Sequence, residues 1–176
     1  GEKIFGESLI SKSTKPINRI GCIPENPPAL PAAIEAIRDA DLIVLGPGSL
    51  FTSLLPNFLV PEIVEALLKN NSPKIYISNL MTQPGETDGL DVFQHIKSIE
   101  RQLLNFGVNT RIFNSILSQG EFERSSVIDY YRSRGAEPVI CNKGRLISDG
   151  YYVLQAPLYS KKITPTLRHD SRRLAR

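Results

Sequence analysis

The sequence contains no tryptophan, one methionine, two cysteines and two histidines among its 176 residues. Cys22 and Cys141 lie far apart and do not form a Cys-x-x-Cys pair, so we expect two buried, reduced thiols in a cytoplasmic protein. With only two histidines and no His-Glu-x-x-His motif, the sequence does not predict a metal site of the zinc type.

The sequence also lacks long apolar runs. None approaches the roughly 20 residues that a membrane-spanning helix needs, and residues 1–4 do not begin a signal-peptide pattern. The apolar fraction of 41% and the charged fraction of 22% are typical of globular proteins and exclude a disordered chain, a collagen-like fibre and a coiled coil. The length suits one domain with its own core. Because the sequence starts without an initiator methionine, we expect a fragment of a longer protein.

Positive charge is concentrated at the end of the sequence. Residues 161–176 contain six basic side chains and a single acidic one, whereas residues 1–160 contain 15 basic and 17 acidic side chains. A nucleic-acid footprint needs basic groups spread over one face, and single-strand binders interleave them with aromatic rings. Neither pattern is present, so we expect no nucleic-acid partner. The charge distribution is still compatible with a local anion site near the basic tail.

From residue 29 onward, the sequence alternates between two kinds of apolar pattern. Short apolar runs predict strands at residues 42–45, 74–78, 110–115, 138–141 and 151–154. Helical spacing predicts helices that begin near Pro31, Pro61 and Asp91, and a further helix around residues 127–131. This alternation predicts an α/β fold: a three-layer α/β/α sandwich with a Rossmann-like, mostly parallel sheet.

The chain divides into three parts. Residues 1–24 contain two apolar stretches, at 4–10 and 17–23, which predict a β-hairpin-like excursion. Residues 25–160 form the α/β core, which we interpret as the C-terminal part of a larger domain. Residues 161–176 form a basic tail that either docks on the core or extends into solvent.

Ligands of open α/β sheets bind outside the carboxyl ends of the strands, so the loops that follow the strands are the first candidates. The first loop is rich in glycine and hydroxyl groups and reads Gly46-Pro47-Gly48-Ser49-Leu50-Phe51-Thr52-Ser53. Glycine lets the backbone approach a ligand closely, and a helix that starts nearby would direct free N–H groups at an anion. A tight strand–helix connection with capping hydroxyls explains the same residues. The loop is neither a Walker A loop nor a nucleophile elbow.

The second loop also follows a strand and is dense in amide and hydroxyl groups, reading Asn79-Leu80-Met81-Thr82-Gln83-Pro84-Gly85-Glu86-Thr87. Such loops suit the recognition of sugar and base edges, although an ordinary polar turn before a capped helix would look alike. Because both loops follow buried parallel strands, we expect them side by side at one edge of the sheet.

Three further residues are candidates for a role in such a site. His95 lies in the first turn of a helix, whose positive end should lower the pKa of the imidazole, although a packing histidine is equally compatible. Arg168 can grip a phosphate with its planar fork, with Asp170 to orient it, unless the tail is merely solvated. Ser171 is flanked by arginines, and phosphate there would compete with a ligand diphosphate for Arg168.

Several of these stretches resemble motifs of one family. The run from Ala40 to Asn57 is similar to the signature of the bacterial gluconeogenesis factors, which are UDP-sugar-binding proteins related to the 2-phospho-L-lactate transferases. Residues 6–10 and 79–87, His95 and the Arg-His-Asp triplet at 168–170 resemble further motifs of that family. The resemblance covers about the second half of the family. The glycine-rich phosphate site of the amino-terminal half has no counterpart here.

The resemblance implies a UDP-sugar-binding regulatory protein that is required for gluconeogenic growth and for control of cell shape and the cell wall. The protein would have no catalytic residue, no metal and no cofactor apart from the UDP-sugar ligand. The two loops and the resemblance together predict the ligand-binding residues Gly46, Pro47, Gly48, Ser49, Thr52, Ser53, Asn57, Asn79, Met81, Thr82, Gly85, Glu86, Thr87, His95 and Arg168.

The alternative is an enzyme of the 2-phospho-L-lactate transferase type, which acts on a nucleotide-activated phospholactate and a deazaflavin acceptor. Those transferases carry Gly-Pro-Ser-Asn-Pro where this sequence has residues 46–50, Gly-Pro-Gly-Ser-Leu. The expected partners are a small-molecule nucleotide sugar, further copies of the same chain in a homo-oligomer, and a Ser/Thr kinase that acts on Ser171. We expect no membrane partner.

Overall fold

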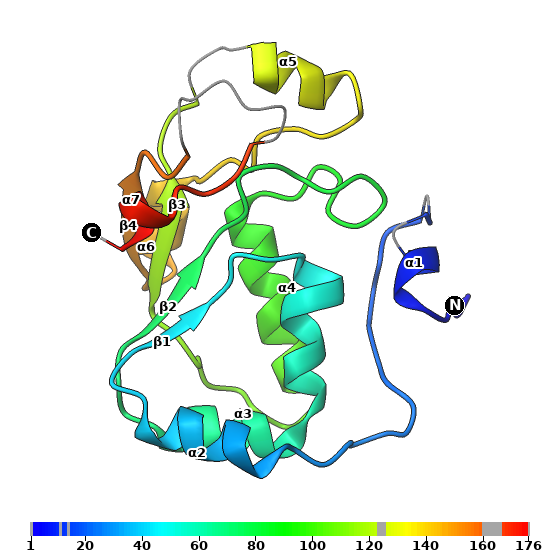
Figure 1. Ribbon diagram of the computed structural model, residues 1–176, viewed down its shortest axis with the longest axis vertical. Coiled ribbons are helices and arrows are strands. Elements are labelled where there is room, and N and C mark those ends of the chain that lie inside the picture. Colours follow the sequence, from blue (N-terminus) through cyan, green and yellow to red (C-terminus); the bar gives the residue numbers. More distant parts are fainter. Residues whose placement is uncertain (1, 11, 14, 123–125, 160–166, 176) are drawn as a thin grey trace.

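The structure is a computed structural model that describes residues 2–10, 12–13, 15–122, 126–159 and 167–175. Four strands form one all-parallel sheet in the order of the sequence: β1 (Ile43–Leu45), β2 (Lys74–Ile77), β3 (Ser115–Gln119) and β4 (Tyr152–Ala156) (Figure 1). This arrangement confirms the predicted α/β class and the parallel sheet.

The helices of the core begin at the signals that the sequence predicts. Proline occupies the start of α2 (Pro31–Asp39) and of α3 (Pro61–Lys69), where its missing N–H group costs no hydrogen bond. Asp91 and Gln94 form the expected capping box before α4 (Val92–Leu104). The remaining helical segments are α1 (Glu7–Ile10), the π-helical turn η1 (Leu50–Leu54), the 3₁₀ helix η2 (Leu55–Leu59), α5 (Ser126–Arg132), α6 (Lys143–Ser148) and α7 (Ser171–Leu174).

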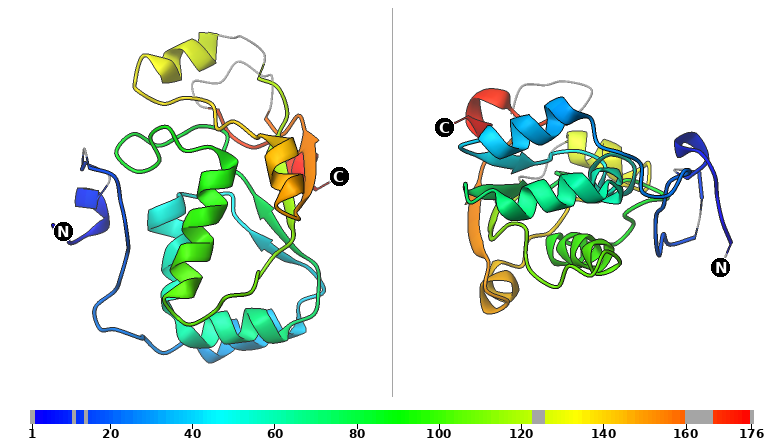
Figure 2. Two further views of the ribbon diagram at one scale, coloured as in Figure 1. Left: turned by 180° about the vertical axis from the view of Figure 1, so that it is seen from behind. Right: turned by 90° about the horizontal axis from the view of Figure 1, so that it is seen from below.

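One face of the sheet forms the main core. Strand register places Leu45, Tyr76, Ile116 and Val153 in a row across all four strands, and each is at most 9% exposed. Buried residues of α3, α4 and α6 join the same apolar cluster, including fully buried Ile96 of α4. Figure 2 shows α4 running along one side of the sheet.

The opposite face of the sheet is partly open. Val44 and Tyr152 lie in the neighbouring register row and are 49% and 74% exposed, and Leu154 is 63% exposed. The strands advance in one direction across the sheet, and crossovers between parallel strands are right-handed, so successive connections fall on the same face. This rule explains why helices α3, α4 and α6 all contribute to one core.

Two of the five expected core strands are wrong in position or kind. The apolar stretch at 110–115 precedes β3, and Ile112 and Phe113 are buried in the main core without joining the sheet. At 138–141 there is a single antiparallel bridge between Pro138 and Met81 of the second loop. Proline has no N–H group to donate to a ladder, so this segment does not extend the sheet.

The β-hairpin-like excursion predicted for residues 1–24 is also wrong. The described residues of this stretch contain the short helix α1 and no strand. Ile17 and Ile20 pack against the main core three residues apart, whereas Ile23 is 82% exposed. Individual apolar residues of this stretch therefore contact the core without pairing as strands. A sequence pattern of short apolar stretches fits both arrangements.

Cys22 and Cys141 are free thiols, each half-buried rather than fully buried as expected. Burial raises the pKa of the Cys141 thiol above its ordinary value. Within the described ranges, no single helix is long and apolar enough to cross a membrane. The stretch Leu50–Leu59 with Pro61–Lys69 reaches that length and composition only across an 82° bend.

Candidate functional site

The two predicted loops lie side by side at the carboxyl edge of the sheet, as expected. They follow β1 and β2, which are neighbours in the sheet. Gly48 N donates to Asn79 Oδ1 at 3.4 Å, and Ser49 Oγ donates to Glu86 Oε2 at 2.5 Å. Two hydrogen bonds therefore join the first loop to the second.

Ser49 is the centre of the contact between the loops. Its hydroxyl caps η1 by accepting from Thr52 N at 3.2 Å, and it also accepts from Thr52 Oγ1 at 2.6 Å. Its one proton is donated to Glu86, whose side chain is buried. Because a hydroxyl has one proton, Ser49 has none left to offer a ligand. Ser49, Thr52 and Glu86 form what we call the loop clamp.

The two glycines of the first loop differ in their constraints. Gly46 has a φ of +92°, and a Cβ atom there would lie 2.8 Å from Ile77 O. Gly48 has no such backbone constraint, and a Cβ atom there would lie 3.5 Å from the Ser53 Cβ atom, an ordinary contact. Gly46 is therefore required by the turn itself, whereas Gly48 leaves room at the surface of the loop.

The two threonine hydroxyls of the second loop are used within the protein, one toward Glu137 and one inside the loop. Thr82 Oγ1 accepts from Glu137 N at 2.9 Å, and Thr82 N donates to Glu137 O at 2.7 Å. Thr87 Oγ1 accepts from Gln83 N at 2.8 Å. Gly85 has a φ of +82°, the left-handed conformation that glycine adopts readily. These residues shape the loop, and Met81 is buried in the apolar cluster beneath it.

The remaining residues predicted for this edge are more accessible. Pro47, Ser53 and Asn57 are exposed, and Asn79 is half-buried. Asn57 Nδ2 donates to Ser53 O at 2.7 Å, so its amide is engaged in the turn between η1 and η2. The side-chain amide N–H groups of Asn79 have no partner among the described residues, so they remain available as donors.

His95 lies beneath the loops and is fully buried. Its Nδ1 atom is 3.1 Å from Tyr76 Oη, whereas its Nε2 atom has no hydrogen-bond partner in the described part of the chain. The pKa of His95 is lowered to about 4, mainly because burial disfavours the charged imidazolium. The direction agrees with the sequence prediction, although burial rather than the helix end is the main cause.

A second buried polar atom near this region also lacks a partner. Gln83 Oε1, in the second loop, makes no hydrogen bond within the described residues. Buried polar atoms are normally paired with protein or water. Gln83 Oε1 and His95 Nε2 are therefore the two atoms here that an additional partner would satisfy.

The C-terminal segment, residues 167–175, docks on the core, and residues 161–166 and 176 of the predicted tail lie outside the described ranges. Asp170 does not orient Arg168 as expected. Its carboxylate accepts from Arg172 N at 3.0 Å, caps α7 and faces Arg173 Nε at 3.7 Å. Arg168 and Ser171 are exposed, and Arg168 makes no hydrogen bond or ion pair with any other described residue.

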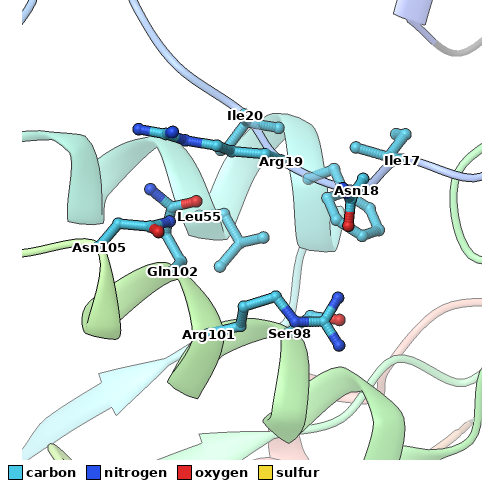
Figure 3. A pocket seen from close by; sticks show the side chains of 10 residues that line it. Ile17, Asn18, Arg19, Ile20, Leu55, Ser98, Arg101, Gln102 and Asn105 are labelled. Atoms are coloured by element: carbon cyan, nitrogen blue, oxygen red, sulfur yellow. The ribbon is translucent and has the colours of Figure 1, made fainter. Parts of the chain in front are cut away.

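A small cavity of about 20 Å³ lies between residues 17–20 and the second half of α4, and Phe51 of the first loop is among its lining residues. Figure 3 shows the guanidinium groups of Arg19 and Arg101 pointing away from each other rather than converging. A volume of this size holds about one water molecule. The cavity is therefore not a site for a nucleotide. No cluster of metal-binding side chains occurs among the residues that the structure describes.

The family of the chain follows from comparison with known proteins. The sequence model described as "2-phospho-L-lactate transferase CofD" matches residues 1–159. The chain belongs to the CofD/UPF0052 family of gluconeogenesis factors. It is 43% identical to the gluconeogenesis factor of Halalkalibacterium halodurans over 162 residues, which cover 88% of this chain and 48% of that protein.

Two further relatives give the same result for this CofD-family chain. The gluconeogenesis factor of Bacillus subtilis is 37% identical over 175 residues, which cover 99% of this chain and 53% of that protein. A crystal structure of a UPF0052 family member from Bacillus halodurans superposes with a TM-score of 0.88 at 39% identity, covering 98% of this chain and 53% of that one. The chain thus spans about half the length of the relatives it matches.

The sequence did not predict the contacts of three further residues near this edge. Tyr76 partners His95, Glu137 pairs with Thr82, and His169 contacts the residue after β2. Only His169 carried a signal, as the middle residue of the Arg-His-Asp triplet. Tyr76 and Glu137 are distant in sequence from their partners and belong to no motif.

The contrast between the glycines of the first loop is testable. Gly46→Ala should lower the free energy of unfolding by about 1–3 kcal/mol, because the new methyl group is held at positive φ against a backbone oxygen. Gly48→Ala should change it by less than about 1 kcal/mol. Urea unfolding followed by circular dichroism measures both. Equal effects of the two substitutions would contradict the assigned roles.

His95 makes stability depend on pH. The folded protein holds His95 neutral down to a pKa of about 4, whereas the unfolded chain binds the proton near pH 6.5. The contribution of neutral His95 to the free energy of unfolding should therefore be fully present above pH 6.5. It should be lost as the pH falls toward 4, by on the order of 3 kcal/mol in all. His95→Gln should flatten this dependence between pH 6.5 and 5 more than His169→Gln does, since burial also lowers the pKa of His169, which is only partly buried. A wild-type slope in His95→Gln would refute the assignment.

Proposed function

We propose that the chain supplies one side of a UDP-sugar site in a regulatory gluconeogenesis factor, which supports gluconeogenic growth and the control of cell shape and the cell wall. The observation that carries the proposal is the pair of loops joined by Gly48–Asn79 and Ser49–Glu86 at the carboxyl edge of β1 and β2. This is the edge where parallel α/β sheets bind their ligands. Relatives named gluconeogenesis factor match the chain at 37–43% identity.

The contacts assign two kinds of role within the proposed site. Ser49, Thr52 and Glu86 bond to one another and fix the loops. Asn79 and Arg168 keep donors that are not used by other described residues, so we assign them to direct ligand contact. A guanidinium suits the diphosphate of a UDP-sugar because its planar fork bonds two oxygens at once.

The alternative function is transfer of a phospholactyl group to a deazaflavin. It is favoured by the description of the matching family as a 2-phospho-L-lactate transferase. The first loop weighs against it, since residues 46–50 read Gly-Pro-Gly-Ser-Leu. We therefore propose a cytoplasmic, homo-oligomeric sensor that has the UDP-sugar as ligand and catalyses no reaction.

Ser171 is a proposed regulatory site within the same function. It is the exposed first residue of α7, three positions after Arg168. Phosphate would add a charge of about −1.5 to −2 and three acceptor oxygens. A phosphorylated Ser171 would compete with the ligand diphosphate for Arg168.

Isothermal titration of the whole protein with UDP-glucose, GDP and a deazaflavin tests the proposal. We expect heat of binding with UDP-glucose alone. Gly48→Val should abolish that binding, because a branched side chain would block approach of the ligand to the loop backbone. The matched control is Gly21→Val, since a Cβ atom at Gly21 meets no atom within 4 Å. Binding of the deazaflavin in place of UDP-glucose would favour the transferase.

A further inference from the structure

The C-terminal segment is held against the carboxyl ends of the strands by polar and apolar contacts. Asp170 N donates to Leu158 O at 2.7 Å, and Leu167 N donates to Tyr131 Oη at 3.1 Å. Leu167 also packs against the apolar cluster that includes Met81 of the second loop. The segment is therefore fixed next to the proposed ligand loops.

His169 joins this segment to β2. Its Nε2 atom lies 3.1 Å from Ser78 O, and Ser78 is the fully buried residue between the end of β2 and Asn79. A carbonyl oxygen only accepts hydrogen bonds, so His169 Nε2 carries the proton and donates it. A second tie comes from the antiparallel bridge between His169 and Tyr159.

This contact acts together with the hydrogen bonds of Leu167 N and Asp170 N, which lie on either side of Arg168. Consecutive Cα atoms are about 3.8 Å apart, so anchoring the His169 side chain on Ser78 O limits how far the backbone of Arg168 can move from the residue that precedes the second loop. Asn79, the next residue after Ser78, accepts from Gly48 N of the first loop. One continuous series of contacts thus runs from the C-terminal segment through both loops.

We propose that His169 is a positioning residue: its hydrogen bond to Ser78 O holds Arg168 at the carboxyl edge, where Arg168 contacts the diphosphate of the nucleotide sugar. This inference rests on the proposed function. It gives the middle residue of the Arg-His-Asp triplet a task distinct from that of Asp170, which caps α7.

The test uses two replacements of His169 in the whole protein. The amide nitrogen of His169→Gln can reach the position of Nε2 and donate to Ser78 O, whereas the shorter side chain of His169→Asn cannot. We expect His169→Asn to weaken UDP-glucose binding about tenfold and His169→Gln to bind within about twofold of wild type. In the Arg168→Ala background, His169→Asn should have no further effect, because the group that it positions is gone.

Hydrogen exchange of the C-terminal segment supplies a readout that needs no ligand. The amide of Asp170 should exchange faster in His169→Asn and at the wild-type rate in His169→Gln. Wild-type affinity of His169→Asn would overturn the inference, as would equal weakening in the wild-type and Arg168→Ala backgrounds or unchanged exchange. Absence of UDP-glucose binding by the wild-type protein would instead overturn the proposed function.

Discussion

The carboxylate of Glu86 is buried at the junction of the two loops, and this burial constrains the rest of the carboxyl edge. Removing a charged group from water is costly unless hydrogen bonds compensate for the loss. Ser49 Oγ supplies one at 2.5 Å, and Thr52 in turn fixes the Ser49 hydroxyl. The first loop therefore cannot move away from the second without leaving a carboxylate unpaired. The loop clamp therefore holds the first and second loops together as one continuous surface.

The sheet beneath the loops places them within reach of each other. β1 and β2 are adjacent and parallel, so their carboxyl ends meet at the same edge. Right-handed crossovers in one direction put α3, α4 and α6 on one face, which forms the main core, and leave Val44, Tyr152 and Leu154 exposed on the other. The same topology thus produces the carboxyl edge that carries both loops and a partly uncovered sheet face.

The sequence predicted the parts of the fold whose signals are local. Pro31, Pro61 and the Asp91 capping box mark helix starts through the geometry of a single turn, and the alternation of elements is sufficient to predict a parallel sheet. Strand predictions from the sequence were wrong where buried apolar residues lie outside the sheet. Ile112 and Phe113 fill the core outside the sheet, whereas β3 ends in Ser118 and Gln119. The Gln119 side chain is buried, and its Oε1 atom accepts from Leu158 N at 2.7 Å, a partner that the sequence does not reveal.

The sequence predicted the position of the candidate site better than the roles of its side chains. Position after a buried strand was enough to find both loops. That Ser49, Thr82 and Thr87 are used within the protein depends on Glu86, Glu137 and Gln83, partners that hydroxyl content alone does not reveal. The sequence did not predict a separate role for His169, because its partner is a backbone carbonyl 91 residues earlier in the chain.

We propose that the two loops form one surface for a UDP-sugar. Hydrogen exchange of the whole protein with and without UDP-glucose tests it most directly. We expect the ligand to slow the exchange of backbone amides at residues 46–53 and 79–87 together. Protection confined to one loop, or located instead around the cavity between residues 17–20 and α4, would contradict it.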